Sequence, residues 1–354
     1  MSAAGNHRWR WRFAGEAAHR ELGDAPEARF AAARIVKANE SREVRTDGEF
    51  FYKIERQPGH GFAAEFRRGV ELAAAGIPVV EHLACGASPA GGALVTRAVP
   101  AVSAAEYLAD HPKPEVEFRE ALARFGRKLA ESPFFHGDLH LGNLLWLPGS
   151  ASFMLVDVRA VRGGLAARIA KLFERHRMLR LPLEIAERLP RAEVLRLLDL
   201  AGAPEPERFF RREWRRESQR RLHEWPRRRR QILAGYAKFT RRDGDRLVAS
   251  RWHGDPAELV AVEGGEELFL NGFLLSLLRI PHAEFPVLDP GRLFRAGALP
   301  EGRPDAAALA DWRERLALAG FDAPAEAWRS DADGTPILVD LRFISTAPQV
   351  DHAR

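Results

Sequence analysis

The chain has 354 residues, 46% of them hydrophobic, and a formal net charge of +5. This length and composition suit a protein with well-packed cores and room for two lobes and a further segment. The single cysteine, Cys85, excludes a disulfide within the chain and suits a reducing compartment. The positive charge is compatible with acidic partners.

The apolar segments argue against secretion and against membrane insertion. Met1–Arg8 is followed by no apolar region, so we expect no secretory signal. The longest apolar run, Leu268–Leu278, contains Asn271 and Ser276 and is too short to span a bilayer. We therefore expect a soluble, cytoplasmic protein.

The first elements along the chain are predicted strands. Trp9–Phe13 alternates aromatic and basic residues, which is typical of an edge strand with one apolar face. A membrane-surface contact is the alternative interpretation. Arg34–Arg45 predicts a strand and a turn, and no glycine lies between Ala31 and Thr46.

A strand and a helix that carry opposite charges come next. Thr46-Asp47-Gly48 is a hairpin turn signal. The strand Glu49–Ile54 contains Lys53, and the predicted helix Phe62–Ala75 has Glu65 in its first turn. A carboxylate is stable there in any case because of the helix dipole. The strand-then-helix order favours an ion pair between Lys53 and Glu65, and Lys37 is a weaker candidate for the lysine.

Two further strands and two helices lead to a polar loop. We predict strands at Val79–Ala84 and Ala93–Arg97, then helices at Ser103–Ala109 and Val116–Glu131. The loop that follows, Phe134–Asn143, reads FFHGDLHLGN.

The loop places a carboxylate and an amide at a spacing typical of phosphoryl transfer. Asn143 follows Asp138 by five residues, as in the H-R-D-x-x-x-x-N loop of protein kinases. An in-line transfer needs a carboxylate that accepts the proton of the attacking hydroxyl and an oxygen ligand for magnesium. A polar turn before a buried strand is the alternative interpretation.

A second candidate magnesium ligand follows the next predicted strand. The apolar run Ala151–Val156 ends in Asp157, and its spacing from Asn143 fits a hairpin. Kinases place the D-F-G aspartate here. This chain has Asp157-Val158-Arg159, so the phenylalanine and the glycine are missing.

These motifs resemble one family in particular. Phe134–Asn143 is similar to the H-G-D-L-H-x-G-N loop of the lipopolysaccharide kinases of the Kdo and heptose (WaaP-like) type. The stretch from Glu65 to Pro78 resembles that family's helix and following turn. The resemblance covers about residues 30–165. The loop alone is shared with aminoglycoside, choline and fructosamine phosphotransferases.

The resemblance implies a fold, a reaction and a set of roles. The expected fold is α+β and protein-kinase-like, with a small N-terminal sheet lobe carrying one helix and a larger, mainly helical lobe. ATP would phosphorylate a sugar hydroxyl of the lipopolysaccharide inner core with magnesium as cofactor. Asp138 would be the base, and Asn143 and Asp157 the metal ligands. Lys53, placed by Glu65, would hold phosphate.

The predicted domains are residues 1–98 for the first lobe, 99–260 for the second and 261–354 for a C-terminal extension without an assigned role. Arginine dominates residues 211–230, which fits either a solvated helix face or a site for sugar carboxylates and phosphates. His253-Gly254-Asp255 repeats the start of the loop, but Val260 replaces the asparagine, so we predict a turn.

The expected partners are ATP and an anionic glycolipid or sugar, with a peripheral contact at the inner face of the inner membrane. No nucleic-acid motif accompanies the basic residues, so we expect no nucleic acid. Three alternatives stay open: a small-molecule phosphotransferase, a protein kinase, and a pseudokinase that binds partners without transfer. The missing glycine-rich loop keeps the last one open.

Overall fold

The computed structural model describes residues 9–56, 62–89, 91–290 and 292–344. The segment Met1–Arg8, part of the predicted first lobe, lies outside the described residues, as does the end of the predicted extension. The chain divides into two compact units, residues 1–184 with 197–203 and residues 185–196 with 204–354. The predicted boundaries at 98/99 and 260/261 stay a proposal.

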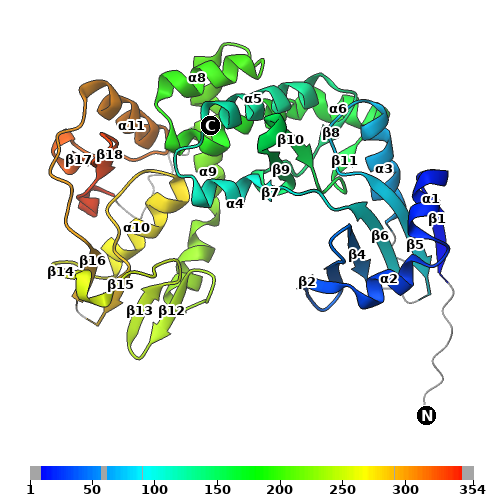
Figure 1. Cartoon of the computed structure of the whole chain (residues 1–354). Helices are drawn as coiled ribbons and strands as arrows, with labels where there is room; N and C mark the ends of the chain where they lie inside the picture. The colour runs from blue at the N-terminus through cyan, green and yellow to red at the C-terminus, as the bar shows by residue number, and fades with distance from the viewer. Residues whose placement is uncertain (1–8, 57–61, 90, 291, 345–354) are drawn as a thin grey trace. The chain divides into compact units, whose positions relative to one another are not determined.

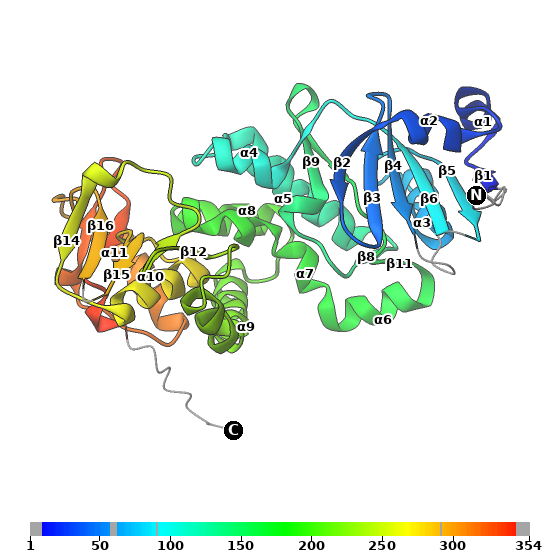
Figure 2. The ribbon, with the colours of Figure 1, turned by 90° about the horizontal axis from the view of Figure 1, so that it is seen from below.

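The first unit begins with a six-stranded sheet in the order β1-β5-β6-β4-β3-β2 (Figures 1 and 2). Its strands are β1 (Arg10–Phe13), β2 (Arg34–Ala38), β3 (Arg42–Thr46), β4 (Phe50–Glu55), β5 (His82–Ser88) and β6 (Gly91–Arg97). Its helices are α1 (Glu16–Leu22), α2 (Pro26–Ala32) and α3 (Ala63–Ala74). The edge strand predicted at Trp9–Phe13 is confirmed, since β1 pairs only with β5 among the described strands.

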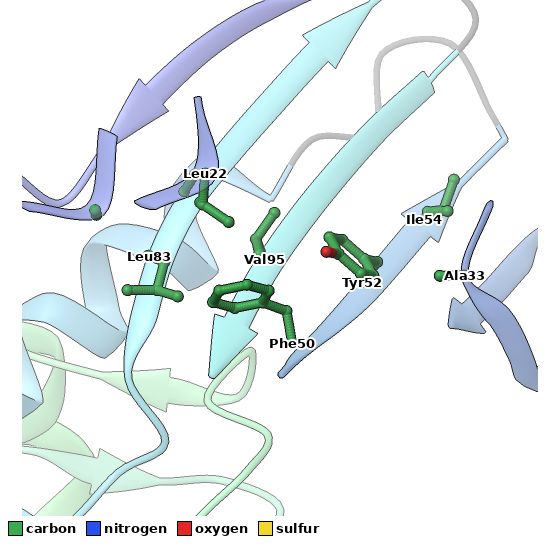
Figure 3. Packing of buried hydrophobic residues seen from close by; sticks show 9 residues of the cluster. Leu22, Ala33, Phe50, Tyr52, Ile54, Leu83 and Val95 are labelled. Atoms are coloured by element: carbon green, nitrogen blue, oxygen red, sulfur yellow. The ribbon is translucent and has the colours of Figure 1, made fainter. Parts of the chain in front are cut away.

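Alternation along β4 sends its side chains to opposite faces of the sheet. Phe50, Tyr52 and Ile54 point to one face, where they pack with Leu83 and Val95 (Figure 3). Lys53 and Glu55 therefore belong to the other face, since side chains two residues apart share a face. The cluster of Phe62, Phe66, Cys85 and Leu94 joins α3 to this unit's sheet. The hydrophobic pattern of one strand thus fixes which face carries the charged residues.

The rest of the first unit is mainly helical. It contains α4 (Ala104–Asp110), α5 (Val116–Glu131), α6 (Gly164–Glu174) and α7 (His176–Leu179). Short strands accompany them: β7 (Val102–Ser103), β8 (Phe135–His136), β9 (Leu144–Leu147), β10 (Ser152–Leu155) and β11 (Val161–Arg162). A small sheet lobe with one helix on its charged face and a helical lobe with a central hairpin make the protein-kinase-like fold, so the predicted fold class is confirmed.

The hairpin of β9 and β10 is held by an aromatic core. Trp146 and Phe153 lie opposite each other in register, with ring centroids 4.9 Å apart. Phe118 of α5 packs edge-on against both, at 5.1 and 5.0 Å. Because these rings fix the hairpin, its open end holds Asn143 and Asp157 near each other.

The second unit contains a long helix and a second antiparallel sheet. Its helices are α9 (Pro206–Leu233), α10 (Glu266–Leu278) and α11 (Ala306–Leu318), and α8 (Arg191–Leu200) is shared between the units. The five-stranded sheet has the order β12-β13-β15-β16-β14, with β12 (Thr240–Asp243), β13 (Arg246–Ala249), β14 (Leu259–Val262), β15 (Val287–Asp289) and β16 (Arg292–Ala296). A separate hairpin joins β17 (Trp328–Ser330) to β18 (Pro336–Leu338).

One buried cation organises the helices of the second unit. Arg315 of α11 is fully buried and donates to Asp311 at 2.7 Å and to the carbonyls of Ala186 and Leu189 at 2.6 and 3.2 Å. Its guanidinium also lies 5.2 Å from the ring centre of Trp214 on α9. All of these partners belong to the second unit, so Arg315 is part of its core.

In the described part of the chain, no helix has the length and apolar character needed to cross a membrane. The predicted turn at His253-Gly254-Asp255 is confirmed, because Asp255 caps the following backbone by accepting from the Ala257 amide at 2.8 Å. The candidate loop is therefore the one in the first unit.

Candidate active site

The candidate catalytic loop starts from a buried histidine at the end of β8. His136 Nδ1 accepts from the Asp138 amide at 3.2 Å, so its neutral ring carries the proton on Nε2, which donates to the Asp157 carbonyl at 2.9 Å. Burial lowers the pKa of His136 against the opposing effect of that carbonyl and of the nearby carboxylates. The ring thereby ties the backbone of Asp138 to that of Asp157.

The loop brings Asp138 and Asn143 together as the sequence predicts. Asn143 Nδ2 donates to the Asp138 carbonyl at 2.9 Å, which leaves the amide oxygen of Asn143 for a cation. The Asp138 carboxylate is largely exposed, and Oδ2 lies 3.9 Å from His140 Nε2. An exposed carboxylate on a fixed backbone can accept a proton from a hydroxyl that docks beside it.

Asp157 follows β10, at the same open end of the hairpin as Asn143, and several cations lie near it. The Val156 amide donates to the Asn143 carbonyl at 3.1 Å, which joins the two predicted magnesium ligands through adjacent backbone. Burial alone would raise the pKa of Asp157, but Lys53, the Arg159 amide, His136 and Arg42 together lower it. The carboxylate is therefore held ionised, as a metal ligand must be.

The predicted lysine–glutamate pair is present. Lys53 Nζ donates to Glu65 Oε1 at 2.7 Å, and Glu65 is buried in the first turn of α3. Lys37, the weaker candidate, lies on the exposed strand β2 opposite Val44. The ammonium has three N–H groups, so a bond to Glu65 leaves donors for an anion.

Two arginines near these residues were missed by sequence reasoning. Arg42 of β3 lies 3.4 Å from the buried carboxylate of Glu55, and Arg159, beside Asp157, lies 3.9 Å from the same group. Glu55 follows Lys53 by two residues on β4, so it faces the same side of the sheet. Only the spatial meeting of β3, β4 and the segment after β10 reveals the cluster.

The turn between β2 and β3 uses its own backbone amides for hydrogen bonds within the turn. In many kinases a glycine-rich loop covers the phosphates at this position. Here Asn39 Oδ1 accepts from the amides of Ser41 and Arg42 at 3.1 and 2.7 Å. These two amides are therefore already bonded within the turn, and the Arg42 side chain lies beside Glu55.

A third missed residue is His82 at the start of β5. It is buried, its Nδ1 donates to the Val80 carbonyl at 2.8 Å, and within the described residues its buried Nε2 has no hydrogen-bond partner. Burial lowers its pKa to about 4, with Lys53 adding to the effect and Asp157 opposing it. A Cβ at Gly69 would lie 2.3 Å from the ring, so α3 packs directly on it.

The donor set suits magnesium held together with phosphates rather than a metal held by protein alone. The described residues contain no group of three or more His, Cys, Asp or Glu side chains that could hold a metal ion. Magnesium is commonly bound through one or two carboxylates, water and substrate phosphates. Asp157 and Asn143 fit that requirement.

The arginine-rich residues 211–230 lie on α9 of the second unit and are extensively ion-paired. Arg220 and Arg221 donate to Glu217 at 2.6 and 2.8 Å, and Arg228 donates to Glu224 at 2.7 Å. Burial alone would raise the pKa of Glu217, but Arg220 and Arg221 lower it to about 2. The pairing favours the interpretation as a charged helix face, and an acceptor-binding role stays a prediction.

The first unit thus combines a protein-kinase-like fold with the loop, the lysine–glutamate pair and the aspartate that the sequence predicted. The sequence matches no protein-family model and no curated protein. Among solved structures, the chain is similar to WbdD bound to a kinase inhibitor, with 20% identity, 48% of this chain and 46% of that chain covered, and a TM-score of 0.31.

Two further solved structures are similar to part of the chain. The aminoglycoside phosphotransferase APH(3'')-Id from Streptomyces rimosus has 16% identity over 52% of this chain and 97% of its own, with a TM-score of 0.33. The PknI kinase domain of M. tuberculosis has 15% identity over 44% and 72%, with a TM-score of 0.32. Because these TM-scores are low, the assignment of the protein-kinase-like fold rests on the topology of this chain.

Proposed function

We propose that the protein transfers the γ-phosphoryl group of ATP to a hydroxyl of a sugar. The observation that carries the proposal is the meeting of Lys53, Glu65 and Asp157 beside the loop with Asp138 and Asn143. The ion pair at 2.7 Å holds the lysine, and its charge in turn lowers the pKa of Asp157. These five polar residues come from four segments of the chain, and phosphoryl transfer has a task for each of them, which supports the proposal.

The reaction assigns a task to each side chain. Asp138 accepts the proton of the acceptor hydroxyl while that oxygen bonds to the γ-phosphorus, and ADP leaves as the bond to its β-phosphate oxygen breaks. Lys53, oriented by Glu65, holds the phosphates. A magnesium ion held by Asn143 and Asp157 would neutralise the negative charge that develops on the phosphates. Arg42 and Arg159 hold the outer phosphate oxygens in place of backbone amides.

The proposed acceptor is an inner-core sugar of lipopolysaccharide. The support is the similarity of Phe134–Asn143 to the loop of Kdo and heptose kinases. Labelled ATP offered with lipopolysaccharide core, free sugars or aminoglycosides, and a generic protein separates the open alternatives. Label in the glycolipid supports the proposal, whereas label in another acceptor moves the assignment to that class.

The test of the chemistry is Asp138→Asn. We expect turnover to fall by about 10²–10⁴-fold, because the proton acceptor is lost, with nucleotide binding and melting temperature unchanged. Asp255→Asn is the matched control, since it alters the same motif start in the turn of the second unit. Turnover that stays normal in a folded Asp138→Asn protein contradicts the assignment.

A pseudokinase is the second candidate function. It is favoured by the bonded amides of Ser41 and Arg42, which remove the usual phosphate cradle. Such a protein would show no ATP turnover with any acceptor. Thermal stabilisation by ATP together with magnesium, but without turnover, would select this candidate.

A further inference from the structure

Helix α6 presents one face to the protein and a different face to solvent. It follows β11 directly and packs against β8, the strand that leads into the candidate catalytic loop (Figure 2). Ala167 and Ala170 are buried, and Lys171 Nζ donates to the carbonyls of Leu129 and Ala130 at 3.2 and 3.0 Å. These bonds satisfy the C-terminal carbonyls of α5 and fix the rotation of α6.

The face turned away from the protein is strongly apolar. Leu165, Ile169, Leu172 and Phe173 are 70, 50, 80 and 76% exposed. Their positions, i, i+4, i+7 and i+8, place them on one stripe of the helix. Single exposed apolar residues need no explanation, but a contiguous patch marks a surface that contacts something other than water.

Positive charge borders this stripe. Three arginines are exposed here: Arg162, Arg168 and Arg175. Arg168 directly precedes Ile169, and Arg175 follows Phe173 by two residues. Glu174 is the one acid in the sequence of α6, and it already pairs with Arg177 at 2.5 Å. The α6 surface, defined as these four apolar residues and three arginines, is therefore apolar and cationic.

We propose that the α6 surface docks the protein on an anionic lipid bilayer. Short amphipathic helices bind in the interface plane with leucine and phenylalanine in the acyl boundary and arginine at the headgroups. A second copy of the chain fits less well. A symmetric interface would bring Arg168 and Arg175 against the same residues of the partner, with no acid on the face to balance them.

The docking has a consequence for the proposed reaction, and this part rests on the proposed function. Asp157 precedes α6 by seven residues. The strand β8, which leads into the loop that carries Asp138, pairs with β11, the strand just before α6. A bilayer bound at α6 would bring membrane-borne sugars into the vicinity of the first unit's catalytic loop. A glycolipid acceptor in the membrane is the substrate class that such a surface serves.

The test uses the full chain with two kinds of vesicle, phosphatidylcholine alone and an equimolar mixture with phosphatidylglycerol. We expect co-sedimentation with the mixed vesicles only. The double variant Leu172→Ser and Phe173→Ser should bind at least about tenfold more weakly, since both side chains leave the acyl boundary. The matched control Val116→Ser alters an exposed apolar residue of α5 and should bind as the parent does.

The charged part is tested with Arg168→Gln and Arg175→Gln together. At low salt we expect about a fivefold weaker association for each arginine removed, and a smaller effect in 1 M salt as the Debye length falls to about 3 Å. Failure of the parent protein to bind mixed vesicles, or equal binding to both vesicles, overturns the proposal. A dimer that dissociates in the serine variant overturns it in favour of self-association.

These outcomes are separable from those of the proposed function. Thermal stabilisation by ATP and magnesium should be the same in the serine variant as in the parent, because the substituted residues lie outside the candidate site. Asp138→Asn should bind mixed vesicles normally. If Asp138→Asn loses turnover but still binds vesicles, both proposals are supported. If Asp138→Asn keeps normal turnover and still binds vesicles, the proposed role of Asp138 is contradicted and the membrane docking is not.

Discussion

Each unit holds a cationic side chain in its interior or at its edge, and the two cations differ in burial and in how completely their hydrogen-bond donors are satisfied. Arg315 in the second unit bonds to a carboxylate and two carbonyls and lies against aromatic rings, including Trp312 at 4.3 Å. Lys53 in the first unit pairs with Glu65, and its side chain keeps 21% exposure. A cation whose three nitrogens all donate to buried protein groups serves the core, whereas one with donors left over is suited to a ligand.

The histidines repeat this contrast. His82 is buried and His282 is half-buried, and desolvation lowers the pKa of each to about 4. In the second unit His282 Nε2 contacts Ser276 Oγ at 3.2 Å, but the described residues provide no partner for Nε2 of His82. A buried polar atom without a partner in a native structure needs an explanation, such as a ligand or a bound water. The described part of the second unit also contains such atoms, for example Trp225 Nε1 and Trp328 Nε1, so what distinguishes His82 is its place against α3 with Lys53 and Asp157 nearby.

The largest expected effects, on stability for Arg315 and on ATP turnover for Lys53, come from replacing each of these cations by methionine. Arg315→Met should lower the free energy of unfolding by about 3–5 kcal/mol, because buried carbonyls and Asp311 lose their partner. Lys53→Met should be less destabilising, since Glu65 can take up a proton, but it should reduce ATP turnover by about 10²-fold or more. Urea unfolding and turnover assays on both variants check this.

The matched control for the first variant is Arg229→Met, on the exposed face of α9 and paired with Glu266 at 3.1 Å. It should change stability by less than about 0.5 kcal/mol. An Arg315→Met protein as stable as this control would mean that the buried arginine is not a core element, and the contrast with Lys53 would fail.

Asp157→Ala sharpens the contrast by removing the proposed magnesium ligand. In the parent protein we expect ATP with magnesium to stabilise more than ATP alone, by about 2.7 kcal/mol for a ligand at a hundred times its Kd. The variant should lose the magnesium-dependent part and keep the rest. Thermal melting with and without magnesium measures both, and a parent protein that shows no shift at millimolar nucleotide would point to the pseudokinase.

Acid should destabilise the chain through its buried histidines. The folded-state pKa of His82 and of His282 is about 4, below the ordinary 6.5, so folding favours the neutral ring. Stability is then full above about pH 6.5 and is lost as the pH falls toward 4, because the unfolded chain binds protons first. From pH 6.5 to 5 each ring should cost about 2 kcal/mol.

Urea unfolding at several pH values measures this loss, and His136, whose pKa is also lowered by burial, adds to it. His282→Asn should flatten the pH dependence of the second unit's transition alone. A stability that does not change between pH 6.5 and 5 would show that these rings are not buried in the folded chain.

The smallest expected effect is that of Arg42→Gln. If Arg42 replaces backbone amides at the phosphates, its loss should raise the KM for ATP by about tenfold, as expected for one charge-assisted hydrogen bond, and leave kcat nearly unchanged. Lys37→Gln, on the neighbouring strand β2, is the matched control. Equal KM values for the two variants would remove Arg42 from the site.

The sequence by itself determined the loop, the helix and the strand that form much of the candidate site, because each depends on residues close together in the chain. The spacing of Asp138 and Asn143 fixes a tight loop, and the predicted helix Phe62–Ala75 is observed as Ala63–Ala74, ending before Gly76 with its positive φ of 71°. The strand predicted at Ala151–Val156 is observed as Ser152–Leu155. Each of these depends on neighbours within a few residues, which a single sequence displays directly.

Only the tertiary structure decided which distant charges meet. Arg42 and Arg159 share Glu55 although more than a hundred residues separate them, and His82 is buried because α3 has Gly69 where it crosses the ring. The α6 surface likewise became visible once Ala167 and Lys171 were seen to face inward, since periodicity alone assigns a larger apolar stripe to the core. Such contacts depend on strand register and helix rotation, which no local pattern encodes.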